Sequence, residues 1–198
     1  MRAFFGIGLP AGVRDSIVSA VAGLRGFHAP VSWTPAENLH ITLKFLGEIS
    51  ADRLPGIEES LRPVAAAIPP FSLLCEGGGV FPGERNPRIF HVGFLEPLEL
   101  VRRLQQNMEN ALSGAGFPRE DRPFHPHITV GRTRGALPPG LGGRYLHRFS
   151  GRRFGVVPVS SFTLYRSRLT PGGAVYSPWI VFPLGGEDAR KVGEENRT

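Results

Sequence analysis

The sequence contains a single cysteine, Cys75, and no long apolar run. One cysteine excludes an internal disulfide and any zinc site built from several thiolates, so the chain does not require an oxidising compartment. No apolar run approaches the roughly 18 residues that a membrane-spanning helix needs. The chain opens on a strand-like run at residues 3–9 and not on a cleavable hydrophobic segment. We therefore expect a cytoplasmic protein that makes no membrane contact, with Cys75 in its core.

Lysine is nearly absent as well. Of 23 basic residues only Lys44 and Lys191 are lysine, and 17 acidic residues leave a net charge of +6. This arginine bias is consistent either with a GC-rich genome or with a surface that attracts phosphates. With 41% hydrophobic and 20% charged residues, the composition excludes disorder, coiled coil and collagen for the body of the chain. A length of 198 residues fits one domain, or two small lobes folded as one unit.

The chain also lacks a phosphate-binding loop of the P-loop type. The run Gly77-Gly78-Gly79 has neither the lysine nor the hydroxyl residue that such a loop requires. We predict that these glycines form a flexible turn within a Gly/Pro-rich connection over residues 77–87.

Hydrophobic periodicity predicts strands and helices in mixed order. Strands are expected at residues 3–9, 39–46, 71–76, 89–95, 125–132, 154–157, 161–167 and 175–183. Helices are expected at residues 10–24, 50–64 and 98–112, whereas the Gly-rich segment before Phe149 has no clear assignment. Adjacent strands with helices between only some of them favour an α+β fold with antiparallel sheet over a doubly wound parallel fold. Residues 1–184 are expected to form one domain, followed by a disordered tail at residues 185–198.

The triplet His-x-Thr occurs twice, at His40-Ile41-Thr42 and at His127-Ile128-Thr129. With 6 His and 7 Thr in the chain, chance predicts about 0.2 such triplets. Because successive side chains of a strand point to opposite faces, the histidine and threonine of each triplet share a face. An imidazole transfers a proton and a neighbouring hydroxyl donates a hydrogen bond to an oxyanion. Two such units that face each other would bracket one phosphate.

The same alternation makes predictions for the neighbours of the two triplets. Lys44 is expected on the His40 face, where it would assist electrostatically, and Phe45 is expected in the core. Strict alternation puts Arg132 opposite His127, unless a bulge at Gly131 turns it back.

Metal chemistry is the alternative interpretation of the second triplet. His125 and His127 have the spacing that places two ligands on one strand face, but no acidic residue or third histidine lies nearby in sequence. We therefore expect no metal and no cofactor, and we expect His125 to line the site or lie on the surface.

Two His-x-Thr triplets in a chain near 200 residues resemble the 2H phosphoesterase superfamily. Within it the sequence is most similar to the bacterial and archaeal RNA 2′,3′-cyclic phosphodiesterases, historically called 2′-5′ RNA ligases. The stretches that carry the resemblance are residues 2–10, 37–47 (ENLHITLKFLG), 81–82 with 87–88, 122–129 (RPFHPHIT) and 162–171 (FTLYRSRLTP). The resemblance extends over nearly the whole chain up to Leu184.

The resemblance implies a two-lobed α+β fold with pseudo-twofold symmetry. Each lobe would hold an antiparallel sheet with helices packed on its outer side, and the two motifs would meet in an active-site cleft between the lobes. The implied activity is metal-independent hydrolysis of RNA 2′,3′-cyclic phosphate ends to 2′-phosphomonoesters. One departure is His91, which stands where many relatives have a tryptophan.

The implied site residues follow the motifs. His40 would be the proton donor and His127 the proton acceptor, while Thr42, Thr129 and Arg132 would bind the phosphate. Arginines and aromatic residues are expected to rim the cleft and contact single-stranded RNA. These residues are Phe81, Arg85, Arg88, Arg119, Arg122 and Phe124.

Three other functions use the same residues. One is 2′-5′ RNA ligation, the same chemistry in reverse with a 5′-hydroxyl in place of water. A non-catalytic RNA-binding module is the second, and action on a small cyclic phosphate is the third. We expect the partner to be RNA with a 2′,3′-cyclic phosphate end, bound by a monomer.

Overall fold

The computed structural model describes residues 1–25 and 29–185, so the tail predicted at residues 185–198 lies, apart from Gly185, outside the described residues. The strands are β1 (Arg2–Gly8), β2 (Val31–Trp33), β3 (His40–Glu48), β4 (Phe71–Phe81), β5 (Ile89–Phe94), β6 (Ile128–Thr133), β7 (Arg153–Val159), β8 (Ser161–Thr170) and β9 (Gly173–Pro183). The helices are α1 (Ala11–Arg25), α2 (Leu54–Ala66), α3 (Glu99–Gly114) and α4 (Leu141–Phe149), with short 3-10 turns η1 (Ala36–Asn38) and η2 (Ala51–Arg53). No helix in the described part of the chain is long and apolar enough to cross a membrane.

All strand pairs of the sheet are antiparallel, which confirms the predicted α+β class. The strand order is β7-β4-β5-β6-β3-β1-β8-β9, and β2 pairs with β6 outside this path. The two central strands, β6 and β3, meet through one register pair, Ile41 opposite Ile128. The sheet therefore consists of two halves joined at the strands that bear the two triplets, with four strands in the β3 half and five, including β2, in the β6 half.

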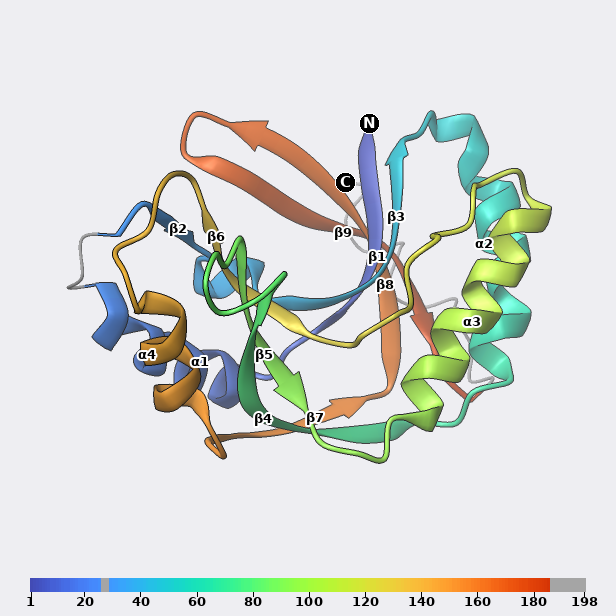
Figure 1. Cartoon of the computed structure of the whole chain (residues 1–198). Helices are drawn as coiled ribbons and strands as arrows, with labels where there is room; N and C mark the ends of the chain where they lie inside the picture. Colours follow the sequence, from blue (N-terminus) through green and yellow to red (C-terminus); the bar gives the residue numbers. More distant parts are fainter. Residues whose placement is uncertain (26–28, 186–198) are drawn as a thin grey trace.

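Each half of the sheet carries two helices (Figure 1). Helices α2 and α3 pack on each other, α2 against β9 and α3 against β3. On the other half, α1 packs against β7 and α4 against β4. The halves are interleaved in sequence, because α1 and α3 each pack on the half that does not contain the strand just before them. We propose on this ground that residues 1–184 form a single domain.

The core lies between the sheet and its helices. In the β3 half, Phe5 packs edge-on against Phe162 and Phe182, whose own rings stack 4.9 Å apart. In the β6 half, Phe90 packs against Tyr145 of α4 at 5.0 Å. All five side chains are nearly inaccessible to solvent, and burial of each stabilises the fold by about 1.5–3 kcal/mol. Cys75 is also buried, as predicted.

Of two glycine-rich segments, one was predicted wrongly and the other was left without an assignment. Gly77 to Gly79 do not form a turn, because β4 continues through them to Phe81. The segment without an assignment contains α4, whose aromatic side chains pack on this part of β4. A Cβ at Gly78 would lie 2.6 Å from that of Phe149 and 2.9 Å from the Tyr145 ring. Glycine is therefore required here for helix packing, a reason that local sequence does not reveal.

Candidate active site

The two His-x-Thr triplets lie side by side at the centre of the sheet, where β3 meets β6 (Figure 1). Antiparallel pairing around Ile41 and Ile128 sets His40 across from Thr129, and Thr42 across from His127. The two isoleucines are fully buried on the face that the helices cover. All four polar side chains therefore project from the opposite face, where they are half-buried.

Both histidine rings are held in the same way. Nδ1 of His40 lies 2.7 Å from the carbonyl oxygen of Asn38, and Nδ1 of His127 lies 2.7 Å from that of His125. Because a carbonyl oxygen only accepts, each Nδ1 donates a proton and each Nε2 is left to accept or release one. The contribution of His125 is thus its backbone carbonyl, while its side chain is exposed.

The two rings differ in what their Nε2 atoms meet. Thr42 Oγ1 lies 2.9 Å from Nε2 of His40, so the hydroxyl donates to the neutral ring. His127 has no such bond to Thr129 among the hydrogen bonds of the described residues. Chemically, Nε2 of His127 is the more available proton acceptor.

The pKa values of both histidines lie below the ordinary value of 6.5. For His40 the largest cause is burial, which is opposed by the bond to Asn38 and reinforced by the positive charges of His127 and Arg132. Burial is also the largest cause for His127, opposed by the bond to His125 and reinforced by Arg132 and the His125 ring. The positive charge of Arg132 thus lowers the pKa of both rings.

A β-bulge explains why Arg132 joins this site. Phe90 pairs with Gly131 and His91 with Thr129, which leaves Val130 as the extra residue in β6. Val130 and Gly131 are both buried, and the exposed Arg132 returns to the His127 face. The bulge that the sequence left open as an exception near Gly131 therefore occurs, at Val130, and strict alternation does not hold for Arg132. Glycine is needed beside it because a Cβ there would lie 2.7 Å from the Trp33 ring.

A second bulge occupies the same place in the first triplet. Phe5 of β1 pairs with Lys44 and Gly6 with Thr42, so that Leu43 is the extra residue of β3. Leu43 and Lys44 are both buried, and Phe45 is turned out to solvent with 61% of its surface exposed. The predictions that Lys44 shares the His40 face and that Phe45 is buried were wrong, because both assumed unbroken alternation.

Lys44 instead forms a buried ion pair on the helix side of the sheet. Its Nζ lies 2.7 Å from Glu109 Oε2 of α3 and 2.8 Å from the carbonyl oxygen of Pro118. Glu109 also accepts a bond from the backbone N–H of Glu120. The pair connects β3 to α3 and to the loop that leads to His127.

Aromatic rings surround each histidine. The His40 ring lies 4.7 Å from the ring of Phe4 and 5.3 Å from that of Tyr176, and Phe4 in turn stacks on Tyr165 at 5.3 Å. None of these three was predicted as a site residue, because β1, β8 and β9 are far from the triplet in sequence. The only signal was that Phe4 and Tyr165 fall in stretches that carry the family resemblance.

The rings beside His127 are those of Phe81 and His91. They lie 5.6 and 5.3 Å from the His127 ring and stack on each other at 4.4 Å. Burial, reinforced by the positive charge of His127, lowers the pKa of His91 to about 4, and its Nδ1 has no hydrogen-bond partner in the described structure. His91 is therefore a neutral ring at neutral pH, next to the second triplet.

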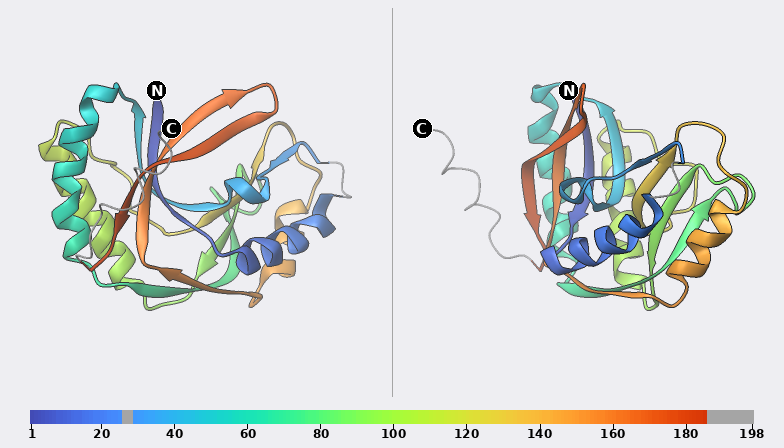
Figure 2. Two further views of the ribbon diagram at one scale, coloured as in Figure 1. Left: turned by 180° about the vertical axis from the view of Figure 1, so that it is seen from behind. Right: turned by 90° about the vertical axis from the view of Figure 1, so that its left-hand side faces the viewer.

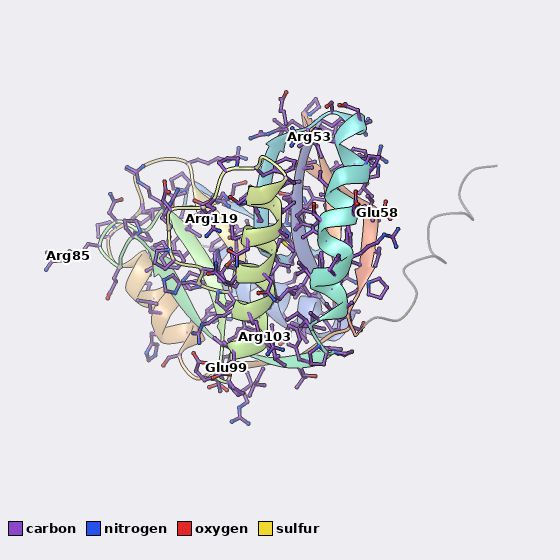
Figure 3. The ribbon with its side chains drawn as sticks, turned by 90° about the vertical axis from the view of Figure 1, so that its right-hand side faces the viewer. Arg53, Glu58, Arg85, Glu99, Arg103 and Arg119 are labelled. Atoms are coloured by element: carbon purple, nitrogen blue, oxygen red, sulfur yellow. The ribbon has the colours of Figure 1, made fainter. Side chains whose placement is uncertain are left out.

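The other residues predicted to rim the site are dispersed. Arg119, Arg122 and Phe124 line a hollow of about 300 Å³ beside α3, together with Gln105 and Glu109. Arg85 and Arg88 lie in the connection between β4 and β5, and the Arg85 side chain projects away from the sheet (Figure 3). Arg88 adjoins β6, because its carbonyl oxygen accepts the N–H of Thr133. Among residues 1–25 and 29–185, no three histidine, cysteine or acidic side chains gather as metal ligands would.

Comparison with known proteins shows similarity over most of the chain. The model of the family LigT like Phosphoesterase matches residues 7–91 and 95–176. A protein of Methanothermobacter thermautotrophicus named RNA 2′,3′-cyclic phosphodiesterase is 34% identical over 184 residues, which are 93% of this chain and 99% of that protein. The Escherichia coli protein of the same name is 32% identical over 89% of this chain and 93% of its own.

Solved structures show the same relation. A protein of Thermus thermophilus superposes with a TM-score of 0.75 at 34% identity, covering 95% of this chain and all of the other. E. coli LigT, crystallised with 3′-AMP, gives a TM-score of 0.70 at 30% identity and covers 92% of this chain and 97% of its own. The likeness in sequence and structure thus includes both strands that bear the triplets. The chain belongs to the LigT-like phosphoesterase family.

Proposed function

We propose that this protein hydrolyses 2′,3′-cyclic phosphate ends of RNA to 2′-phosphomonoesters, without a metal ion. The observation that carries the proposal is the register of β3 and β6, which sets two imidazoles and two hydroxyls on one face of the sheet. The shared tautomer supports it, because both Nε2 atoms are available for proton transfer. The names of the relatives support the substrate class.

In the proposed reaction the two histidines act in line on opposite sides of phosphorus. Neutral His127 takes a proton from water at Nε2 as the water oxygen bonds to phosphorus. The bond from phosphorus to the ribose 3′-oxygen breaks, and protonated His40 donates its Nε2 proton to that oxygen. The product carries a 2′-phosphate and a 3′-hydroxyl, and proton exchange with solvent restores both rings. Each proton transfer contributes about 100- to 10,000-fold in rate.

The charge that develops on phosphate has three ligands in this proposal. The hydroxyls of Thr42 and Thr129 donate hydrogen bonds to the non-bridging oxygens, and the guanidinium of Arg132 pairs with their negative charge. All three lie on the histidine face, Arg132 because of the bulge in β6. The assignment of His40 as acid and His127 as base follows the family resemblance.

The experiment is an assay of the purified chain on a short RNA that ends in a 2′,3′-cyclic phosphate, with excess EDTA. We expect full turnover, and phosphorus NMR should show a 2′-phosphomonoester as the only product. Loss of activity with EDTA and recovery with a divalent ion would contradict the metal-independent mechanism. A 3′-phosphate product would show that the substrate lies in the opposite orientation. Addition of an RNA with a 5′-hydroxyl tests for ligation.

A further inference from the structure

We propose that the aromatic surface beside His40 binds the base of the RNA's terminal nucleotide, the one that carries the cyclic phosphate. This surface consists of Phe45, Tyr165 and Tyr176 arranged over Phe4. The inference rests on the proposed function, because it uses the positions of His40 as the general acid and His127 as the general base. It adds a binding site for an unpaired nucleobase and names Phe45 as the most exposed ring of that site.

The surface is continuous with the His40 ring. Phe4 is 3% exposed and forms the floor, with ring centroids at 4.9 Å from Tyr176, 5.3 Å from Tyr165 and 5.9 Å from Phe45. The same Phe4 ring lies 4.7 Å from His40. A planar ligand placed on these rings would therefore lie next to the acid of the proposed reaction.

The exposure of Phe45 requires an explanation, since a side chain of this size buries about 150–250 Å² in a typical core. The bulge at Leu43 turns Phe45 to the face of His40 and Thr42, where 61% of its surface is exposed to solvent. The alternative, without a bulge, would have placed this ring in the core and Lys44 on the surface. An exposed aromatic ring on the same face as the catalytic pair is suited to stacking on a base.

The reaction geometry selects this side of the site. In an in-line displacement, water attacks from the His127 side and the 3′-oxygen leaves toward His40. Because the leaving oxygen stays attached to its ribose, that ribose lies on the His40 side of phosphorus. The base hangs from the same ribose, so the rings beside His40 are the ones within its reach.

The corresponding position in the other half has different chemistry. Phe45 is the sixth residue of HITLKF and Arg132 is the sixth of HITVGR, each following a bulge at the fourth residue. The site thus presents an aromatic ring on the His40 half and a guanidinium on the His127 half. A nucleotide matches this polarity, since one end is a planar base and the other an anionic phosphate. Phe45 has no hydrogen-bonding atom, so we expect little preference among the four bases at this ring.

Hydrolysis of two matched RNAs tests the proposal. Both end in a 2′,3′-cyclic phosphate, but one carries adenine on the terminal ribose and the other carries hydrogen in its place. Phe45→Leu, which keeps apolar bulk and loses the flat ring, should raise KM for the adenine substrate by about 5- to 100-fold with kcat unchanged. The same variant should leave KM for the abasic substrate unchanged, and Phe45→Tyr should retain the wild-type KM for both. Val156→Ala, which shortens a 53% exposed apolar side chain on β7, serves as the matched surface control.

The possible outcomes separate the proposal from its alternatives. An equal effect of Phe45→Leu on both substrates, or no effect on either, would overturn the base contact. If Phe81→Leu raises KM for the adenine substrate alone and Phe45→Leu does not, the nucleobase lies beside His127, and the proposed contact with Phe45 is also overturned. Binding of the corresponding 2′-phosphate RNAs is measured in parallel. A wild-type chain that hydrolyses neither substrate would contradict the proposed function. In that case, tighter binding of the adenine RNA that is lost in Phe45→Leu would still support the base contact. Equal binding of the adenine and abasic RNAs would refute the contact.

Discussion

The two halves of the sheet carry the same triplet and the same bulge, yet their surroundings differ. Both histidines donate from Nδ1 to a carbonyl two residues earlier, and both triplets are followed by one extra residue in the strand. The half with β3 then presents Phe45, while the half with β6 presents Arg132. The repeated backbone arrangement thus holds two imidazoles in equivalent positions, and in the proposed mechanism the residue after each bulge determines what binds beside them.

The hydrogen bonds of the two rings differ as well. Thr42 bonds to Nε2 of His40, and the carbonyl that holds this ring belongs to Asn38. The Asn38 side chain donates to the carbonyl oxygen of Ala174, near the end of the β8–β9 hairpin that projects beyond the other strands (Figure 2). His40 is therefore tied to a neighbouring hairpin, whereas His127 is held by its own loop. The variants below test how far this difference extends to function.

Loss of either imidazole should have the largest effect. We expect His40→Ala and His127→Ala each to lower kcat by at least about 100-fold, because each removes one of two proton-transfer groups. Single-turnover hydrolysis of the cyclic phosphate RNA measures the loss, and circular dichroism checks that the fold is intact. Near-normal turnover by either folded variant would remove that histidine from the mechanism and break the equivalence of the halves.

Loss of the Arg132 guanidinium should lower kcat/KM by about 10- to 100-fold, the contribution of a charge-assisted bond. It should also move the pH profile. Activity is lost as pH falls through the pKa of the base, His127, and as pH rises through the pKa of the acid, His40. Both pKa values lie below 6.5. The wild-type maximum of kcat/KM should therefore lie below pH 6.5. Arg132→Gln removes a charge that lowers both pKa values, so both limbs should move to higher pH.

The matched control for Arg132→Gln is Arg103→Gln, which removes the same charge from the exposed side of α3 (Figure 3). This variant should keep both the wild-type rate and the wild-type profile. A profile that is flat from about pH 4 to 9 would contradict the acid-base assignment, since this range brackets both titrations. If the titrations of His40 and His127 are coupled, each limb of the pH profile reports the pair of histidines and not a single residue.

Removal of the hydroxyls should have a smaller effect and compares the halves directly. Thr42→Val and Thr129→Val keep the shape of the side chain, and each should lower kcat by about 10-fold through loss of one bond to the phosphate. Thr42→Val should cost less, because the bond to His40 that it also removes stabilises the neutral ring, which cannot act as the acid. Equal losses in steady-state kinetics would show that this bond does not matter for turnover.

The smallest effect concerns stability. The pKa of His91 is about 4 in the folded chain against 6.5 for an ordinary histidine, so the unfolded chain binds the proton more readily between these values. The contribution of neutral His91 to the unfolding free energy is therefore complete above about pH 6.5 and is lost as pH falls toward 4. Between pH 7 and 5 we expect a decrease of about 1–2 kcal/mol in the unfolding free energy, measured with urea. His91→Gln should reduce this decrease, and an unchanged decrease would contradict burial of the neutral ring.

Much of the architecture follows from local pattern. The alternation in LHITLKFL and the periodicity after Leu98 predict a strand and a helix that match β3 and α3. The α+β class follows from the order of such elements. Helix α4 was not predicted, because its glycines disfavour a helix locally and its stability comes from Tyr145 and Phe149 packed on β4.

The sequence by itself determined that each histidine shares a strand face with its threonine, because alternation over three residues is local. It did not determine the face of Lys44, Phe45 or Arg132, which lie beyond the bulges at Leu43 and Val130. A bulge depends on the register of the partner strand, and the partners here, β1 for β3 and β5 for β6, are distant in sequence. Tertiary structure therefore decided that Phe45 is exposed on the His40 face, that Arg132 lies on the His127 face, and that Phe4, Tyr165 and Tyr176 come together beside His40.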